Sequence, residues 1–273
     1  MKIDLHTHST VSDGTDSPSA LVRKMAAAGL SAFALTDHDA LMGLPEAREE
    51  AARAGIELIS GAEISSEHGD QDDIHILALF VDEANASFNA SLAVRQQARR
   101  QRGQRMAEKI VAAGFPIDLD AIRADVGDGV WGRPHLARAL VRAGHATSMD
   151  DAFDRFLGDE HPWFVAYEKW KAVDVVKAVR AAGGVTSIAH AVWYRGSDAL
   201  IRALAAEGLD AVEVHHPDHG PDEEARLAHL ADELGLLATA GSDFHGTPEG
   251  RKVPGGVTGD GAMLEALRAR ARA

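Results

Sequence analysis

The chain of 273 residues contains no cysteine. Disulfides and thiolate metal sites are therefore excluded, and any metal site must use histidine, aspartate or glutamate side chains. No stretch is long and apolar enough to be a membrane span, and no apolar signal region follows the first methionine. These absences predict a cytoplasmic protein that does not enter a membrane.

Basic residues are also in deficit, with 28 Lys and Arg against 42 Asp and Glu and a formal net charge of −14. An acidic surface disfavours broad, non-specific binding to nucleic acid. Bound divalent cations would offset part of this negative charge. An anionic substrate is therefore not excluded, but it requires positive charge close to the site.

Short apolar runs recur along the chain, and most of them follow a helix-like stretch that ends in glycine. Such glycines are typical of helix C-termini, and the repeated unit is typical of parallel β/α folds. A ring of these units places its active site at the C-terminal ends of the strands. The runs are Ile3–Leu5, Ala32–Leu35, Ile56–Ile59, Val185–Ala189, Leu209–Val214 and Leu236–Ala240.

One apolar run, Ile74–Val81, breaks this pattern because His75 stands at its beginning instead of after its end. Either this strand runs antiparallel to its neighbours, or its ligand enters the site differently. We therefore expect the barrel to be irregular at this point. Ser17-Pro18 and Leu44-Pro45-Glu46 each predict the start of a helix.

The β/α rhythm stops between residues 84 and 168. A long helix is predicted over Ser87–Gly114, and the shorter helices are predicted over Leu119–Val126, Pro134–Ala143 and Met149–Leu157. We expect a barrel domain formed by residues 1–83 and 169–273, with 84–168 as a mostly helical insertion that covers the catalytic face. The long helix carries five arginines, which could attract a nucleic acid strand but which we interpret as a solvated helix face: Arg95, Arg99, Arg100, Arg102 and Arg105.

Histidine and carboxylate residues gather where the predicted strands end. Taken singly, each histidine is more often a cap or a surface residue, but the whole set matches the strand ends too well for chance. Mixed imidazole and carboxylate ligands suit manganese, iron or zinc, and so many ligands require two or three ions. The candidate ligands are His6, His8, Asp13, His38, Glu63, His75, His190, Asp243 and His245.

These motifs resemble those of the PHP (polymerase and histidinol phosphatase) family. The resemblance rests on His6-Thr7-His8, Thr36-Asp37-His38, Gly61-Ala62-Glu63, the single His75 and His190, and Asp243-Phe244-His245. It implies a distorted (β/α)7 barrel with a trinuclear metal site, and family members mostly hydrolyse phosphate esters.

The family pattern also implies how the ligands are shared. The first ion would be held by His6, His8, Glu63 and Asp243. The second would be held by Glu63, His75 and His190, with Glu63 bridging, and the third by Asp13, His38 and His245.

Further residues are candidates for binding substrate phosphate. Arg133, in Gly132-Arg133-Pro134-His135, precedes a predicted helix N-terminus, where an anion binds readily. These residues and Lys169 resemble a family branch that acts on nucleoside 3′,5′-bisphosphates. We expect Arg133, His135 and Lys169 to contact substrate. The segment Val212-Glu213-Val214-His215-His216 also resembles that branch. An aromatic residue often stands there in place of His215, so the role of His215 stays open. His216 is the candidate for a phosphate contact or for the acid that protonates the leaving group.

The sequence therefore predicts a metal-dependent phosphoesterase with Asp243, Glu63 and His216 in catalytic roles. A hydroxide that bridges the ions would attack phosphorus in line. The resemblance favours release of the 3′-phosphate from a nucleoside 3′,5′-bisphosphate such as pAp. The alternatives are a 5′→3′ exonuclease on short oligonucleotides, histidinol-phosphate phosphatase, and a non-catalytic metal-binding module. The sequence indicates no obligate protein partner.

Overall fold

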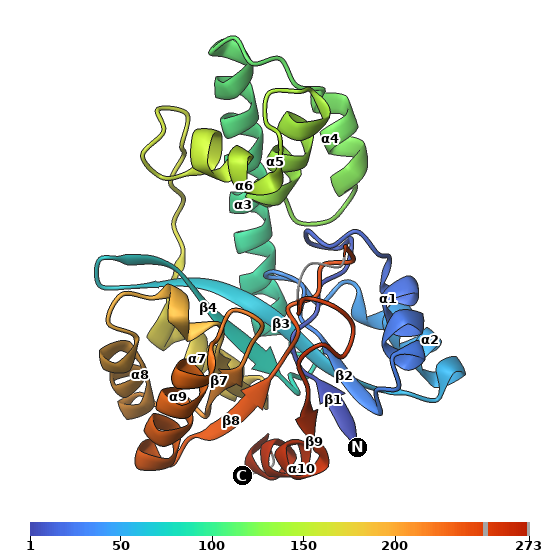
Figure 1. Ribbon diagram of the computed structural model, residues 1–273, viewed down its shortest axis with the longest axis vertical. Coiled ribbons are helices and arrows are strands. Elements are labelled where there is room, and N and C mark those ends of the chain that lie inside the picture. The colour runs from blue at the N-terminus through green and yellow to red at the C-terminus, as the bar shows by residue number, and fades with distance from the viewer. Residues whose placement is uncertain (248–250, 272–273) are drawn as a thin grey trace.

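A barrel of seven strands forms the centre of the computed structural model, which describes residues 1–247 and 251–271 (Figure 1). In order around the sheet they are β1 (Lys2–Asp4), β2 (Ala32–Leu35), β3 (Glu57–His68), β4 (Gln71–Leu79), β6 (Val185–Ile188), β7 (Ala211–His215) and β8 (Leu237–Ala240). The backbone N–H of Leu5 donates to the Ala240 carbonyl at 3.0 Å. This bond joins the first strand to the last and nearly closes the barrel, which confirms the predicted fold class.

Strand β4 runs antiparallel to both of its neighbours, β3 and β6, while the β1–β2–β3 and β6–β7–β8 pairs are parallel. This confirms the first of the two explanations for the position of His75. Because the strand is reversed, its beginning lies at the same end of the barrel as the ends of its neighbours. His75, in the middle of β4, therefore reaches the same site as residues that follow the parallel strands.

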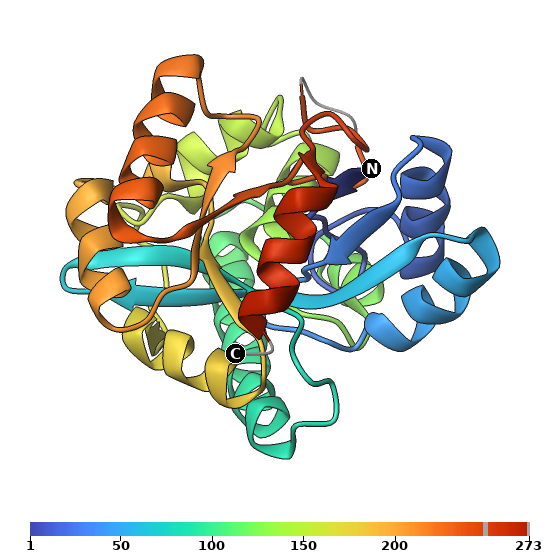
Figure 2. The same cartoon turned by 90° about the horizontal axis from the view of Figure 1, so that it is seen from below.

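The two remaining strands, β5 (Trp170–Lys171) and β9 (Gly259–Asp260), are short additions to β3 and β1. Helix α10 (Gly261–Ala271) follows β9 and crosses the end of the barrel opposite the insertion (Figure 2). Its Leu264 and Leu267 are fully buried among apolar residues of the barrel strands, such as Ile3 and Leu79. The C-terminal helix therefore closes the barrel at its base and leaves the other end for the site.

Helices cover the outside of the barrel, and most follow a strand in sequence: α1 (Pro18–Ala27), α2 (Leu44–Ala54), α7 (Ala172–Ala181), α8 (Ser197–Ala206) and α9 (Pro221–Leu234). The N-terminus of α1 is capped by Ser17, whose side chain accepts the Ala20 N–H at 3.2 Å, with Pro18 in the first turn. Both predicted helix starts are confirmed. Among the described helices, none combines the length and the apolar character needed to cross a bilayer.

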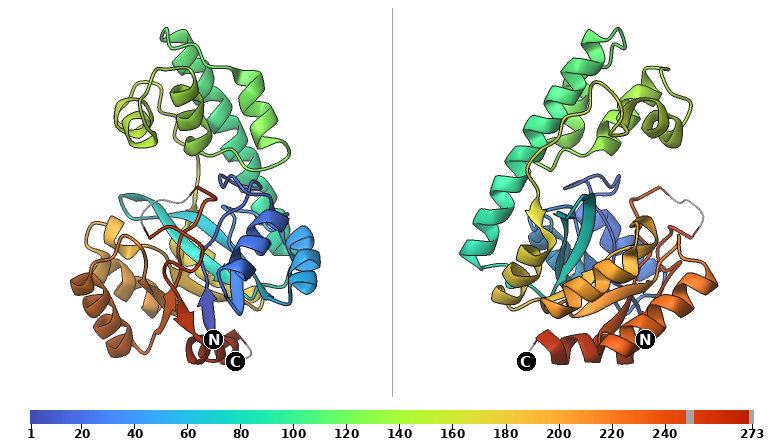
Figure 3. Two further views of the ribbon diagram at one scale, coloured as in Figure 1. Left: turned by 45° about the vertical axis from the view of Figure 1, so that its right-hand side comes forward. Right: turned by 90° about the vertical axis from the view of Figure 1, so that its left-hand side faces the viewer.

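The insertion stands above the barrel and is connected to it by the long helix α3 (Ala86–Ala112), as Figure 3 shows. It continues with α4 (Leu119–Val126), α5 (Arg133–Arg142), α6 (Met149–Ala152) and a π-helical turn over Phe153–Leu157. These helices bury their own apolar cluster, which includes Met106, Trp131 and Phe156 and is separate from the two barrel clusters. The separate core supports our proposal that residues 84–168 form an insertion.

Two arginines of α3 correct the interpretation of this helix as a solvated face. Arg99 and Arg102 are each only 7% exposed. The Arg99 guanidinium donates to Asp39 Oδ2 and to Ser65 Oγ, both at 2.7 Å, and Arg102 Nε donates to the Val165 carbonyl at 2.8 Å. The sequence pattern missed this because the barrel and the chain returning from the insertion cover this side of the helix.

Asp4 links the two strands that close the barrel. Its Oδ1 accepts the Ser242 N–H at 2.9 Å and the His6 N–H at 3.3 Å, while Oδ2 has no hydrogen-bond partner. Burial raises the pKa of Asp4 to about 6. The folded protein therefore holds a proton here between pH 6 and the ordinary aspartate range, whereas the unfolded chain does not.

We predict that Asp4→Asn removes one pH-dependent part of the stability. As pH falls from 7 to 4, the wild-type protein should gain on the order of 2–3 kcal/mol in free energy of unfolding relative to the variant, because only its folded state takes up this proton. Chemical denaturation of both metal-free proteins across this range measures the difference. Asp232→Asn, at an exposed position on α9, is the control and should follow the wild-type curve; parallel curves for Asp4→Asn would contradict the prediction.

Candidate metal centre

The nine predicted ligands lie together at the end of the barrel that faces the insertion. They come from segments far apart in the sequence, which only the closed barrel brings side by side. The segments that follow β1 and β8 run side by side, and the Asp243 N–H donates to the His6 carbonyl at 2.9 Å. Close approach here requires Gly241, because a Cβ at that position would lie 2.3 Å from the His6 Cβ.

Glu63 lies at the middle of the cluster and is 1% exposed. Its Oε2 lies within 3.1–3.3 Å of a ring nitrogen of each of three histidines, and its Oε1 within 2.8–2.9 Å of two more. The first set is His6, His8 and His38, and the second is His75 and His190. A single carboxylate with five imidazoles around it is suited to bridge two cations.

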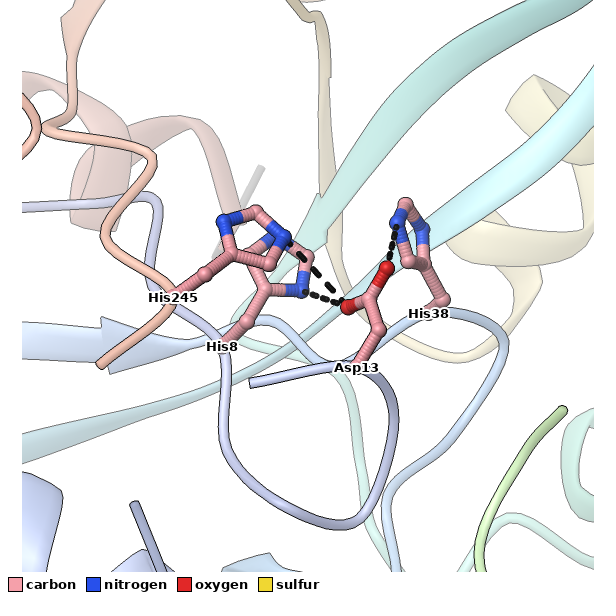
Figure 4. A group of neighbouring side chains, drawn as sticks. All are labelled: His8, Asp13, His38 and His245. Carbon is pink, nitrogen blue, oxygen red and sulfur yellow. Dashed lines mark ion pairs between the residues drawn. The ribbon is translucent and has the colours of Figure 1, made fainter. Parts of the chain in front are cut away.

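Asp13 forms a second focus, shown in Figure 4. Its Oδ1 lies 3.3 Å from His245 Nε2 and 3.8 Å from His8 Nδ1, and its Oδ2 lies 3.5 Å from His38 Nε2. The family pattern implied Asp13, His38 and His245 for one ion, and the geometry adds His8 to this group.

Asp243 forms the third focus. Its Oδ1 lies 3.4 Å from His6 Nε2, and its Oδ2 lies 3.4 Å from His216 Nε2 and 3.1 Å from Lys252 Nζ. The Asp218 N–H donates to His216 Nδ1 at 3.1 Å. A neutral His216 ring therefore carries its proton on Nε2, and this suits a hydrogen-bond donor towards Asp243 better than a metal ligand.

The donor atoms of this cluster fit metal ions. Besides His216 Nε2, which faces Asp243, four ring nitrogens of the predicted ligands are buried without any hydrogen-bond partner although they face carboxylates: His6 Nε2, His8 Nε2, His38 Nδ1 and His75 Nδ1. Unpaired buried polar atoms are costly, and a cation would satisfy all of them. His6 shows the required tautomer, because its Nδ1 lies 3.0 Å from Glu213 Oε1, which leaves the lone pair on Nε2.

The charge states of several ligands also agree with metal binding. Burial would raise the pKa of Glu63 and Asp243, but the surrounding histidines lower both well below the usual range. Burial lowers the pKa of His190 to about 4. Near neutral pH the carboxylates are therefore charged and His190 is neutral, as ligands must be. Burial would lower the pKa of His6 and His245, but the carboxylates around them raise the first well above its usual value and the second to about 9, so bound cations would have to displace these protons.

Glu213 and Tyr194 form an outer layer that the sequence reasoning did not assign. Glu213 is fully buried, and its second oxygen accepts the His190 N–H at 2.8 Å. The Tyr194 hydroxyl accepts the His75 N–H at 2.9 Å and lies 3.1 Å from His190 Nδ1. The sequence did contain a signal for Glu213, because this glutamate lies inside an apolar strand that ends at His215. A charged residue is rarely buried without a partner, so its position indicated a buried contact.

A cavity of about 640 Å³ opens over the cluster and reaches the insertion. The barrel contributes Asp13, Glu63, Asp243 and several of the histidines to its wall. The insertion contributes cations, which are Arg99, Arg102, Arg133 and Arg138, and Lys252 lines the cavity from the barrel side. The cavity therefore has a metal-ligating floor and a cationic wall, which suits a substrate with more than one phosphate.

The predicted substrate residues differ in their positions. Arg133 lines the cavity and pairs with Asp73 and Asp159 at 2.5 and 3.1 Å. Lys169 is buried and its ammonium group binds Asp72 and Asp73, so it faces the β3–β4 hairpin and is not among the residues that line the cavity.

His135, His215 and His216 also lie off the cavity wall, and His216 is fully buried beside Asp243. His135 is buried, with its Nδ1 accepting the Gly132 N–H at 3.1 Å at the start of α5. His215 pairs with Glu224 at 3.0 Å. The substrate-binding roles of Arg133, His135, Lys169 and His216 stay predictions.

Comparison with known proteins agrees with this site. The family model of the PHP domain matches residues 4–127. A 5′-3′ exoribonuclease of Haemophilus influenzae is 36% identical over 89% of this chain and 90% of its own length. A 3′,5′-nucleoside bisphosphate phosphatase of Chromobacterium violaceum is also 36% identical, over 91% of this chain and 88% of its own length.

Solved structures extend the comparison to the whole chain. A Bifidobacterium adolescentis protein classed as a metal-dependent phosphoesterase superimposes with a TM-score of 0.90 at 34% identity, over 98% of this chain and 96% of its own. An amidohydrolase from Chromobacterium violaceum, solved with bound sulfate and no metal, gives 0.89 at 33% identity, over 99% and 97%. The fold and site thus define a metal-dependent phosphoesterase, a hydrolase. The chain belongs to the PHP family.

We predict that Glu213→Gln weakens metal binding by about 10–100-fold, the usual cost of losing an outer partner of a histidine ligand. The amide has one oxygen and cannot accept both the His6 ring N–H and the His190 backbone N–H, so either the His6 ring or the His190 backbone loses its partner. Titration of the metal-free protein with Mn²⁺ in the presence of a competing chelator measures the affinity. Asp210→Asn is the matched control, because Asp210 is a buried carboxylate that binds Thr186 away from the cluster; unchanged affinity in Glu213→Gln would contradict the prediction.

Proposed function

We propose that this phosphoesterase removes the 3′-phosphate from nucleoside 3′,5′-bisphosphates, converting pAp to AMP and phosphate. The observation that carries this proposal is the pairing of a metal-ligating floor with an arginine-rich wall in one cavity. The volume of about 640 Å³ lies in the range of small-ligand sites. The similarity to the bisphosphate phosphatase of Chromobacterium violaceum supports the same substrate.

The two phosphates of such a substrate would be bound at opposite walls. The phosphate to be removed would lie over Glu63 and Asp243, and the retained 5′-phosphate would lie on the insertion side. Arg133 is suited to the latter because a guanidinium binds a phosphate through two parallel hydrogen bonds. Arg102 lies in the same wall of the cavity and adds positive charge.

The metal ions are proposed as two or three in number, most simply manganese, with iron or zinc as alternatives. Glu63 would be shared by two of the ions. Asp13, His38 and His245 would hold another ion, and Asp243 would complete the ligands of the ion held by His6 and His8. When bound, such ions supply an activated water and stabilise negative charge on phosphate oxygens.

The reaction places separate demands on the side chains of the chain itself. Water adds across the bond between phosphorus and the 3′-oxygen, and the 3′-oxygen leaves with a proton. His216 Nε2 is suited to hold a proton beside Asp243, while Arg99 and Arg133 keep the phosphates in place through charge. The cytoplasmic location and the absence of an obligate partner stay predictions.

A second candidate function is 5′→3′ exoribonuclease activity, which the relative in Haemophilus influenzae favours at the same identity. Both reactions break the same kind of bond, between phosphorus and the 3′-oxygen of a nucleotide that carries a 5′-phosphate. They differ only in whether the phosphorus carries a further nucleotide. The same site could therefore serve both, and the space beyond the metal ligands decides between them.

A substrate panel tests the function. The Mn²⁺-loaded protein should release phosphate from pAp faster than it degrades 5′-phosphorylated di- and trinucleotides or releases phosphate from histidinol phosphate. Asp243→Asn should abolish turnover and lower the metal content, because it removes one charged ligand. Preferential turnover of the oligonucleotides would favour the exoribonuclease, and no turnover of any of these compounds would refute the enzyme function.

Arg133→Ala should raise KM for pAp by about 10–100-fold, the loss expected for a hydrogen bond to a charged group. KM for an aryl monophosphate, which has no second phosphate, should change far less. Arg142→Ala is the control, because this arginine lies at the end of the same helix and pairs with Asp125 at 2.6 Å outside the cavity. Equal effects of Arg133→Ala on both substrates would exclude a contact with the second phosphate.

A further inference from the structure

Trp193 is a large apolar side chain that stays 52% exposed in the wall of the cavity. It lies in the short 3₁₀ helix Ala191–Trp193, directly after His190. A tryptophan ring usually buries most of its surface, and an exposed one in a cavity is more informative than one on a convex surface. The exposure therefore requires an explanation beyond packing.

The ring of Trp193 is fixed although it is exposed. It stacks on the His190 ring with centroids 4.0 Å apart and an angle of 28°, and it meets His216 edge-on at 5.9 Å. The Lys252 ammonium group lies 5.3 Å from the indole centroid. Because the indole is already held in place, a ligand that stacks on it loses little freedom of the protein side chain.

The ring also lies next to the proposed metal site. His190 Nε2 lies 2.9 Å from Glu63, the centre of the proposed metal site, and Trp193 covers the same imidazole. A phosphate bound above Glu63 would bring the sugar attached to it close to the indole. The group on the far side of that sugar would be the base of the nucleotide.

We propose that Trp193 is a stacking platform for the base of the nucleotide substrate. The inference rests on the proposed function and adds to it a binding site for the base of the substrate. A flat, apolar, exposed ring beside an anion site matches a flat aromatic base joined to a phosphate. Stacking uses the face that all bases share, so the platform recognises a base with little preference among the bases.

The test compares two substrates on Mn²⁺-loaded protein: pAp, and the bisphosphate of the same sugar with hydrogen in place of the base. The wild-type protein should show a kcat/KM higher by about tenfold or more for pAp, within the range of stacking contributions. Trp193→Ala should lose most of this ratio through a higher KM for pAp, and Trp193→Phe should retain much of it. An unchanged ratio in Trp193→Ala would overturn the proposal.

Two further measurements separate stacking from a merely structural role. Metal content and thermal stability of Trp193→Ala should match the wild-type protein; a fall in both, with equal losses on the two substrates, would mean that Trp193 only shields His190 and would overturn the platform. Val192→Ala is the control, because this neighbouring side chain is 37% exposed and is not among the residues that line the cavity. It should keep the wild-type ratio.

The outcomes also separate this proposal from the proposed function. If the wild-type protein hydrolyses both bisphosphates equally well, the platform is wrong and the bisphosphate phosphatase stands. If it hydrolyses neither but degrades oligonucleotides, the substrate proposal is wrong. In that case Trp193→Ala should raise KM for an ordinary oligonucleotide more than KM for an oligonucleotide whose first residue lacks its base. Equal changes in the two KM values, or no change, would overturn the platform as well.

Discussion

The buried carboxylate of Glu63 is the constraint on which the rest of the site depends. Removing a charge from water is costly unless partners compensate it, and here the partners are five imidazoles contributed by separate segments. The five imidazoles come from four segments of the chain, and all four must reach the same level of the barrel. The closing bond from Leu5 to Ala240 and the reversal of β4 both serve this requirement.

The insertion and the barrel contribute opposite charges to the cavity. The barrel provides the carboxylates that would hold cations, and the insertion provides arginines that would hold phosphate. The two parts are joined by direct contacts at the site, such as Arg99 with Asp39 and Arg138 with the Asp13 carbonyl at 3.0 Å. The insertion therefore contacts Asp13, a proposed metal ligand, and Asp39, the neighbour of the proposed ligand His38.

Several elements could be predicted from local sequence because local physics decides them. Ser17-Pro18 specifies a helix start through its own side-chain cap, and Ala32–Leu35 forms a strand with the predicted bounds. The order of histidine and carboxylate motifs could be interpreted through their place after each strand. His75 was the one motif for which sequence left two explanations, because strand direction depends on pairing with β3 and β6 and not on the strand itself.

The sequence by itself determined the β/α rhythm, the interruption of that rhythm and the proposed set of ligand residues, since these follow from periodicity, capping and the lack of cysteine. Only the tertiary structure decided which side chains meet. Glu213 became an outer partner of His6, and Arg99 became a buried contact of Asp39. Trp193 stayed exposed at the cavity while Lys169 became buried against the hairpin. The reason is physical: these pairings join residues between 60 and 207 positions apart in the sequence, and no local pattern encodes such contacts.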